Sequence, residues 1–529
     1  MKKLLCKTVT VTACLVMPFL ANSAEQYYGL YPQSDFIATT GECQHCNSIP
    51  QALWYFGQEH IAIPKAKTQN FNPTLATQAD VKHWLANSKT QSLPSLIWTG
   101  KTDVLHGAFN SDARAFQIDE KLTPFHTIEK IPSNLSYYNE KSRAYFANQT
   151  VTVYGEQTPE GFTTHSIWPE KFNLNAQKTP YQPLKNDKVL ELVRHNVGGA
   201  DAPFQARVLW QKSEQITWQN KPVLAFVLNG AQGDDDEAHG GHFAVASGRF
   251  GENGEWQDWL VNNFYNLGSV SEKGIIAASV PMYRYQAELN SGQSWYRPSY
   301  MLVAVFKSER NAALYQNAIN RVFHHFYRQD FLYRHAGVNC AGINVETLRT
   351  LGWQIPKRGA TNLPKAFAAL PFKAIQEGNL ESGLKAFDYL AAEQTNLYPA
   401  VAFEAISQDL LGRIALSRTK SDFESALAED LEAIIYVHIP QFPSSRAFGQ
   451  APVASLDEYM ARVPEDMTQW KIVPVAPRPF PNHLLDNNAP TEPIRPAIYG
   501  LIFWVLVLMG LALAFYQFLK NRTKLGNKK

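Results

Sequence analysis

Residues 333–353 read "YRHAGVNCAGINVETLRTLGW", and this stretch contains Cys340, the only cysteine after residue 46. The run "CAGINVETLRTLG" predicts a helix, with Gly352 just beyond it as a stop signal. Unpaired N–H groups at a helix start, together with the helix dipole, lower the pKa of a thiol. A lone cysteine before a helix is more often a packed core residue. The position of Cys340 nevertheless favours a nucleophile if a base lies nearby.

The best-placed base is His242 in "HGGHFAVASGRF", where two glycines precede a strongly predicted strand. A histidine on a rigid strand can be held in one orientation. The next predicted strand, "WQDWLVNNFYN", offers Asn262, Asn263 and Asn266 to orient the imidazole through its second nitrogen, and we favour Asn263. The chain order is then His, Asn, Cys. A circularly permuted papain-like fold has this order, whereas a papain-like fold has the cysteine first.

Three short motifs resemble a known family. "GGHFAVA", "FYNLG" (Phe264–Gly268) and "NCAGINVETLRTLG" are similar to the periplasmic cysteine-dependent domain of one family of bacterial lipoprotein N-acyltransferases. That domain is similar in turn to permuted NlpC-type and lecithin:retinol acyltransferase-like enzymes. The resemblance covers roughly residues 190–360 and implies that His242 and Cys340 are the catalytic pair. Asn339 and Asn266 are motif neighbours of this pair, and we expect both to bind substrate. The family has a multi-span membrane part, where this chain has a single C-terminal apolar run.

The predicted fold class is α+β. We expect a mixed α/β region at 25–150, a permuted papain-like domain with an antiparallel sheet at 151–360, a helical region at 361–470 and a Pro-rich linker at 471–496. Within the helical region, Ser421 and Glu424 have the spacing of a capping box. Hydrophobic residues make up 45% of the chain and charged residues 18%, which suits a globular protein with two or three cores.

Both ends of the chain predict export and membrane attachment. Residues 1–24 have a basic start, an apolar core and small residues before the predicted cleavage site, as in a signal peptide. The run 498–519 carries no formal charge and is long enough to cross roughly 30 Å of hydrocarbon. A basic tail, 520–529, follows it and is expected in the cytoplasm. We therefore expect a single-pass inner-membrane protein with its body in the periplasm. A lipoprotein signal ending at Cys14 is a weaker alternative, as is a buried core helix at 498–519.

An oxidising compartment gives the cysteines a simple interpretation. Cys43 and Cys46 form the motif "CQHC" and are expected to pair in a structural disulfide, with Cys340 left as a free thiol. A redox-active module and a metal site are the alternatives for the CxxC motif.

Two other groups are weaker candidates. The cluster from Asp234 to His242, "DDDEAHGGH", contains carboxylates and an HxxH pattern that would suit a metal-dependent hydrolase, although a solvated acidic loop is the simpler reading. Arg328 and Arg334 lie close in sequence to Cys340, and either would suit an anionic head group or a carboxylate of the substrate; a polar helix face is the simpler reading.

The sequence supports two classes of function. In the first, Cys340 attacks an acyl carbonyl and His242 moves the proton, while N–H groups at the helix start stabilise the oxyanion. The substrate would be an inner-membrane lipid, a lipoprotein or a peptidoglycan-derived peptide, and neither a cofactor nor a metal is expected. In the second, the papain-like module is a non-catalytic scaffold of the envelope. The net charge of +2 argues against a nucleic-acid partner.

Overall fold

The structure is a computed structural model of the 529-residue chain. It describes residues 25–43, 46, 49–65, 93–118, 121–127, 138–184, 188–195, 202–214, 217–232, 239–267, 275–415, 421–444, 449–463, 466, 479–485 and 510–517. The predicted signal peptide and basic tail lie outside these residues, as does most of the Pro-rich segment and of the apolar run at 498–519.

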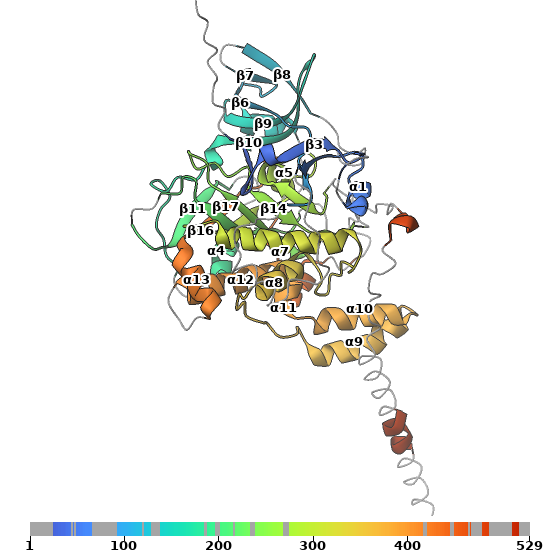
Figure 1. Cartoon of the computed structure of the whole chain (residues 1–529). Helices are drawn as coiled ribbons and strands as arrows, with labels where there is room; N and C mark the ends of the chain where they lie inside the picture. Colours follow the sequence, from blue (N-terminus) through green and yellow to red (C-terminus); the bar gives the residue numbers. More distant parts are fainter. Residues whose placement is uncertain are drawn as a thin grey trace, which may run out of the picture.

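An antiparallel seven-stranded sheet forms the centre of the molecule (Figure 1). Its strand order is β11-β17-β16-β12-β13-β14-β15. The bounds are Gln205–Gln211 (β11), Pro222–Asn229 (β12), His242–Arg249 (β13), Leu260–Asn263 (β14), Ala278–Pro281 (β15), Ser299–Phe306 (β16) and Leu431–Ile439 (β17). The central strands β12 and β16 are buried along their whole length, which explains their near-continuous apolar sequences. The α+β class and the antiparallel sheet are confirmed.

Helices cover the sheet face on which the candidate site lies (Figure 1). The helices α7 (Arg310–Tyr327) and α8 (Cys340–Thr350) pack on β13, and α12 (Pro399–Ser407) packs on β12 and β13. The short helices α11 (Gln394–Leu397) and α4 (Val189–His195) lie against α8 and α12, respectively. The apolar residues of α7 recur with helical spacing and form a buried face that includes Leu314, Ile319 and Phe323.

A closed barrel crosses the predicted boundary at residue 150. The barrel order is β10-β8-β7-β6-β9. Its strands are Asp103–Phe109 (β6), Ala115–Ile118 (β7), Lys121–Thr127 (β8), Thr150–Thr158 (β9) and Gly161–Pro169 (β10). Strand β9 pairs with β6 from before the boundary and with β10 from after it. The long hairpin β9–β10 therefore belongs with the N-terminal strands.

The rest of the N-terminal region is small. A three-stranded sheet contains Phe36–Thr40 (β3), His60–Pro64 (β4) and Ile97–Trp98 (β5), and a short ladder joins Tyr27–Tyr28 (β1) to Tyr31–Pro32 (β2). The helices here are Pro50–Tyr55 (α1) and Glu140–Phe146 (α3). The short helix Met282–Ala287 (α5) packs on β10 of the barrel and on the neighbouring helix Gln293–Tyr296 (α6).

The region 361–470 is not entirely helical, because it supplies β17 to the central sheet. The capping box of Ser421 and Glu424 is confirmed and begins α13 (Asp422–Asp430). The helix ends at Asp430, and the β-branched and aromatic run "LEAIIYVHI" then inserts between β11 and β16. The remaining helices of this region are Leu363–Gln376 (α9), Leu380–Ala391 (α10), a π-helix at Gln408–Ala415 and Leu456–Arg462 (α14).

Within the described ranges, no helix combines the length and apolarity that crossing a membrane requires. Of the predicted span 498–519, residues 510–517 are described, and they are helical. Their exposed side chains include Leu511, Leu513 and Phe515.

Candidate functional site

Cys340 is the first residue of α8, and Asn339 is the N-cap of this helix. The side-chain oxygen Oδ1 of Asn339 accepts hydrogen bonds from the backbone N–H groups of Ala341 (2.9 Å) and Gly342 (2.8 Å). The Asn339 amide donates to the carbonyl oxygens of His335 (2.8 Å) and Leu397 (3.2 Å). Both ends of this side chain are thus used to join the loop before Cys340 to α8 and α11. Asn339, which we expect to bind substrate, thus uses its side chain to hold Cys340 in position.

The Cys340 thiol is almost fully buried, with 5% of the residue exposed. Burial raises the pKa of the thiol, and this outweighs the hydrogen bonds from the Phe243 backbone and the Tyr333 hydroxyl, the charge of Arg297 and the Ala341 N–H, all of which lower it. The helix start acts in the predicted direction, but the expectation that it leaves the thiol with a depressed pKa is wrong. Phe243 directly follows His242 on β13, so these contacts bring Cys340 to the beginning of that strand.

His242 and Asn263 lie on neighbouring antiparallel strands, β13 and β14, and their side chains are in contact. The Nε2 atom of His242 lies 2.6 Å from Oδ1 of Asn263, while the Asn263 amide donates to the carbonyl oxygen of Ile276 (3.2 Å). Because the amide nitrogen is used in this way, Oδ1 faces the ring and accepts a hydrogen bond from the ring N–H. The neutral imidazole therefore carries its hydrogen on Nε2, which leaves Nδ1 as the basic atom.

The imidazole is neutral at ordinary pH. Burial, with a smaller contribution from the charge of Arg297, lowers the pKa of His242 to about 3, although the hydrogen bond to Asn263 acts in the opposite direction. Together with the raised thiol pKa, this gives a resting pair of neutral thiol and neutral imidazole. Cys340 and His242 do not form the thiolate–imidazolium pair of an ion-pair nucleophile.

Tyr265 and Arg297 complete the surroundings of His242. The Tyr265 ring stacks on the imidazole, with 4.2 Å between centroids and 10° between planes. The Tyr265 hydroxyl accepts from Arg297 (3.2 Å) and from Gln293 (3.4 Å). Burial raises the pKa of Tyr265, so this phenol stays protonated at neutral pH.

Arg297 is a buried arginine, with 1% of the residue exposed. It donates to Gln293 Oε1 through Nε (2.9 Å) and Nη2 (2.6 Å), and to the carbonyl oxygen of Gly230 (3.1 Å). Among the residues that the structure describes, no carboxylate forms an ion pair with it. Its charge therefore acts on its neighbours, and it lowers the pKa of both Cys340 and His242. Sequence reasoning missed Arg297, although it is the only charged residue in the apolar and aromatic run 294–306.

The other predicted residues lie at varying distances from this arrangement. Asn262 bonds to Gln316 (2.8 Å), away from His242. Asn266 is exposed, and Arg334 is partly buried and pairs through its backbone with Val338 in the loop before Cys340. Cys43 and Cys46 are joined by a disulfide, and Cys340 is the free cysteine of the described chain.

The acidic half of the predicted metal cluster lies outside the described residues, since these begin again at His239. Among the described residues, no group of three or more His, Cys, Asp or Glu side chains is arranged to hold a metal ion. His239 lies beside Tyr459, with 5.8 Å between ring centroids.

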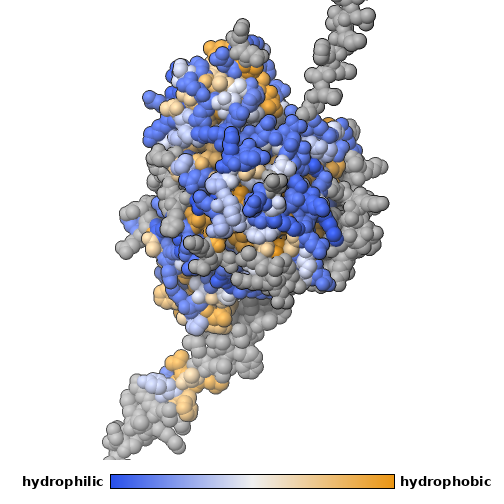
Figure 2. Space-filling view, turned by 90° about the vertical axis from the view of Figure 1, so that its left-hand side faces the viewer, coloured by the Kyte–Doolittle hydropathy of each residue, from blue (hydrophilic) through white to orange (hydrophobic). Residues whose placement is uncertain are grey.

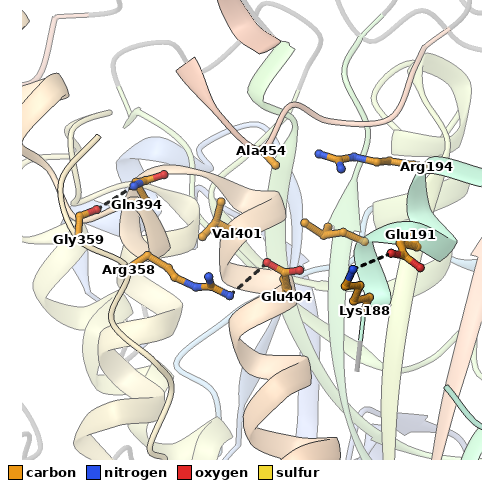
Figure 3. Close-up of a pocket in the computed structure, with 10 residues that line it drawn as sticks. Lys188, Glu191, Arg194, Arg358, Gly359, Gln394, Val401, Glu404 and Ala454 are labelled. Atoms are coloured by element: carbon orange, nitrogen blue, oxygen red, sulfur yellow. Dashed lines mark hydrogen bonds and ion pairs between the residues drawn. The ribbon is translucent and has the colours of Figure 1, made fainter. Parts of the chain in front are cut away.

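A separate cleft of about 430 Å³ lies between α4, α11 and α12 (Figure 3). Two ion pairs cross or line it, Lys188–Glu191 (3.3 Å) and Arg358–Glu404 (3.3 Å). Its basic side chains are thus matched by acidic ones, and neither Cys340 nor His242 lines it.

Comparison with known proteins adds no relative: the chain matches no protein-family model, no curated protein and no solved structure.

Proposed function

We propose that the protein is a thiol enzyme that forms an acyl-enzyme on Cys340, with His242 as the base and Asn263 as the residue that orients it. The observation that carries this proposal is the 2.6 Å contact between His242 Nε2 and Asn263 Oδ1, at the strand whose next residue, Phe243, contacts the Cys340 thiol. A cysteine at a helix start, a histidine on a strand and an amide on the neighbouring strand form the set that acyl transfer by a thiol requires.

In the proposed reaction, the Cys340 sulfur attacks the acyl carbonyl carbon while its proton moves to His242 Nδ1. The carbon–oxygen or carbon–nitrogen bond of the donor then breaks, and the leaving group takes the proton from Nδ1. An acceptor, either water or an amine, gives its proton to Nδ1 and attacks the thioester, and the thiol recovers that proton as it leaves. Since both groups are neutral at rest, the proton moves during attack rather than before it.

The oxyanion donors differ from those that the sequence suggested. The N–H groups of Ala341 and Gly342 are already bonded to Asn339. The Tyr333 hydroxyl accepts from the Cys340 N–H (3.3 Å) and contacts the thiol. Burial raises the pKa of Tyr333 far above its ordinary value, so its proton stays available for donation. We infer that the Tyr333 hydroxyl leaves the sulfur as the sulfur attacks the carbonyl carbon, and then donates to the oxyanion of the tetrahedral intermediate.

We further propose that the substrate is a lipid, a lipoprotein or a cell-wall peptide at the outer face of the inner membrane. The grounds are the signal-like residues 1–24 and the apolar run 498–519 with its basic tail. A reporter that works only in the cytoplasm should be active when it is fused after Lys529. Activity of a reporter that requires export would overturn the orientation.

The catalytic proposal is tested by labelling with a thioester acyl probe. The native protein should form an acyl adduct on Cys340, and His242→Ala should slow the labelling by about 10² to 10⁴-fold. His239→Ala is the matched control, since this histidine lies beside Tyr459, and it should label at nearly the native rate. If Cys340 reacts only after denaturation, the enzyme proposal fails and a non-catalytic scaffold remains.

A further inference from the structure

The helices α9 and α10 form an antiparallel hairpin that projects from the body of the molecule (Figure 1). Its inner contacts are small and tight: Gly383 lies against the backbone of Leu370, and Ala366, Leu370 and Leu390 are buried. Gly378 makes the turn with φ of +68°, a conformation that suits glycine. The hairpin is therefore a packed element with a defined tip.

Large apolar side chains gather at that tip. Phe372 and Ile375 lie in the last turns of α9 and are 65% and 82% exposed, and Leu380, the first residue of α10, is 53% exposed. Scattered exposed apolar residues are ordinary, but a cluster of them on a projecting element indicates a binding surface for another molecule or a membrane.

The charges of the hairpin cancel. Residues 363–391 contain three lysines and three acidic residues, which is a net charge of zero. Lys373 pairs with Glu377 (3.5 Å) and Lys385 with Glu381 (2.9 Å) on the surface beside the tip. Docking of this tip would therefore depend on the apolar side chains and not on attraction to a charged partner.

The segment 510–517 suggests what covers the tip. Leu511, Leu513, Phe515 and Tyr516 are each about 60% exposed in this helical segment. The segment lies at the same end of the molecule as α9 and α10 (Figure 1), and the space-filling view shows hydrophobic residues on it beyond the lower end of the body (Figure 2). A convex tip would need a matching pocket on a protein partner, whereas a bilayer deforms around it. One bilayer would cover both surfaces.

We propose that Phe372, Ile375 and Leu380 insert into the interfacial region of a lipid bilayer. The root of the hairpin is joined to the Cys340 helix, because Arg349 of α8 binds the Glu393 carboxylate through two nitrogens (2.8 and 3.0 Å). Insertion of the tip thus orients α8 toward the membrane surface. The docking itself does not depend on the catalytic proposal.

The test uses the full chain carrying Cys340→Ser and a single new cysteine, Ile375→Cys, labelled with an environment-sensitive fluorophore. After reconstitution with phosphatidylethanolamine–phosphatidylglycerol vesicles, the probe should shift to shorter emission wavelength and be quenched by lipid-borne nitroxide. Adding Phe372→Ser and Leu380→Ser should lower the immersed fraction by about tenfold or more.

The matched control is Leu122→Cys, another exposed apolar position (55%) on the barrel strand β8 at the opposite end of the molecule (Figure 1). Its probe should stay water-exposed in the same vesicles. Immersion at residue 375 should survive a rise in salt and occur equally on phosphatidylcholine vesicles, because the hairpin has no net charge. A probe at 375 that stays water-exposed with reconstituted protein overturns the proposal and leaves a protein partner as the occupant. Acyl labelling of Cys340 in detergent reports on catalysis separately.

Discussion

At the scale of single residues, the site depends on buried groups whose ionisation is controlled by their surroundings. Cys340 and His242 are both neutral because both are buried, and Arg297 is a positive charge without a carboxylate partner among the described residues. That charge favours the thiolate form of Cys340 and disfavours protonation of His242. Arg297 therefore acts through its neighbours as a positioning and electrostatic residue.

Replacing Arg297 with Met should change the pH dependence of Cys340 more than it changes folding. Loss of the charge should raise the pKa of the thiol and of His242, so the alkylation rate of Cys340 by iodoacetamide should rise at a higher pH than in the native protein. Arg284→Met is the control, since Arg284 is equally buried (2% exposed) but lies over Trp98, away from the thiol. An unchanged pH profile for Arg297→Met would contradict this role.

Two adjacent glycines before His242 differ sharply in what they tolerate. Gly241 has φ of +75°, and a Cβ there would lie 2.3 Å from the Asn229 carbonyl oxygen, whereas a Cβ at Gly240 would meet nothing within 4 Å. Gly241→Ala should lower the free energy of unfolding by about 1–3 kcal/mol and slow acyl labelling, because His242 would shift. Gly240→Ala should leave both nearly unchanged. If Gly241→Ala and Gly240→Ala had equal effects on urea unfolding and on acyl labelling, the backbone before His242 would not be constrained as proposed.

At the scale of elements, the N-cap of α8 couples helix stability to the position of the nucleophile. Asn339→Ala should lower the free energy of unfolding by about 1 kcal/mol through loss of the N-cap. It should also slow acyl labelling of Cys340, because the same side chain joins the loop before Cys340 to α11. Asn379→Ala is a matched control: Asn379 caps α10 through the Ser382 N–H (2.8 Å), far along the hairpin. It should cost a similar amount in urea unfolding without slowing the labelling. Loss of labelling in both variants would mean that general destabilisation, rather than the cap, is responsible.

Strand β17 illustrates a limit of reading elements along the sequence. The helical pattern of 421–430 continues without a Gly or Pro into "LEAIIYVHI", so the sequence alone favours a helix that runs past residue 430. Residues 431–439 instead form a strand between β11 and β16, because antiparallel pairing with both neighbours satisfies the backbone hydrogen bonds of the whole segment. Tertiary pairing overrides local helical preference there.

At the scale of the whole molecule, buried ionisable groups set how stability depends on pH. Burial lowers the pKa of His242 to about 3 and that of His324 and His438 to about 4, so the unfolded chain binds protons below pH ~6.5 that the folded protein does not. Each histidine should then lower the free energy of unfolding by roughly 2 kcal/mol between pH 7 and pH 5. Asp258 opposes them: burial and the nearby charge of Glu255 raise its pKa to about 7, so the folded state gains a proton as the pH falls.

We therefore expect the free energy of unfolding to fall by roughly 3 kcal/mol between pH 7 and pH 5, once the opposing contribution of Asp258 is included. Asp258→Asn removes that contribution, so the free energy of unfolding of the variant should fall by roughly 6 kcal/mol over the same interval. Urea unfolding at the two pH values measures both. A native protein that is more stable at pH 5 than at pH 7 would contradict the assignment of neutral buried histidines.

The sequence by itself determined what depends on neighbours along the chain. The helix start at Cys340, the strand of His242, the α7 periodicity and the Ser421 capping box follow from patterns a few residues long. Asn263 was favoured over Asn262, and strand alternation points the two to opposite sheet faces, so only one of them reaches His242. Only the tertiary structure decided the rest. Arg297, Tyr265 and Tyr333 come from three separate loops. The pKa of Cys340 rises because burial, which no local pattern encodes, outweighs the helix start.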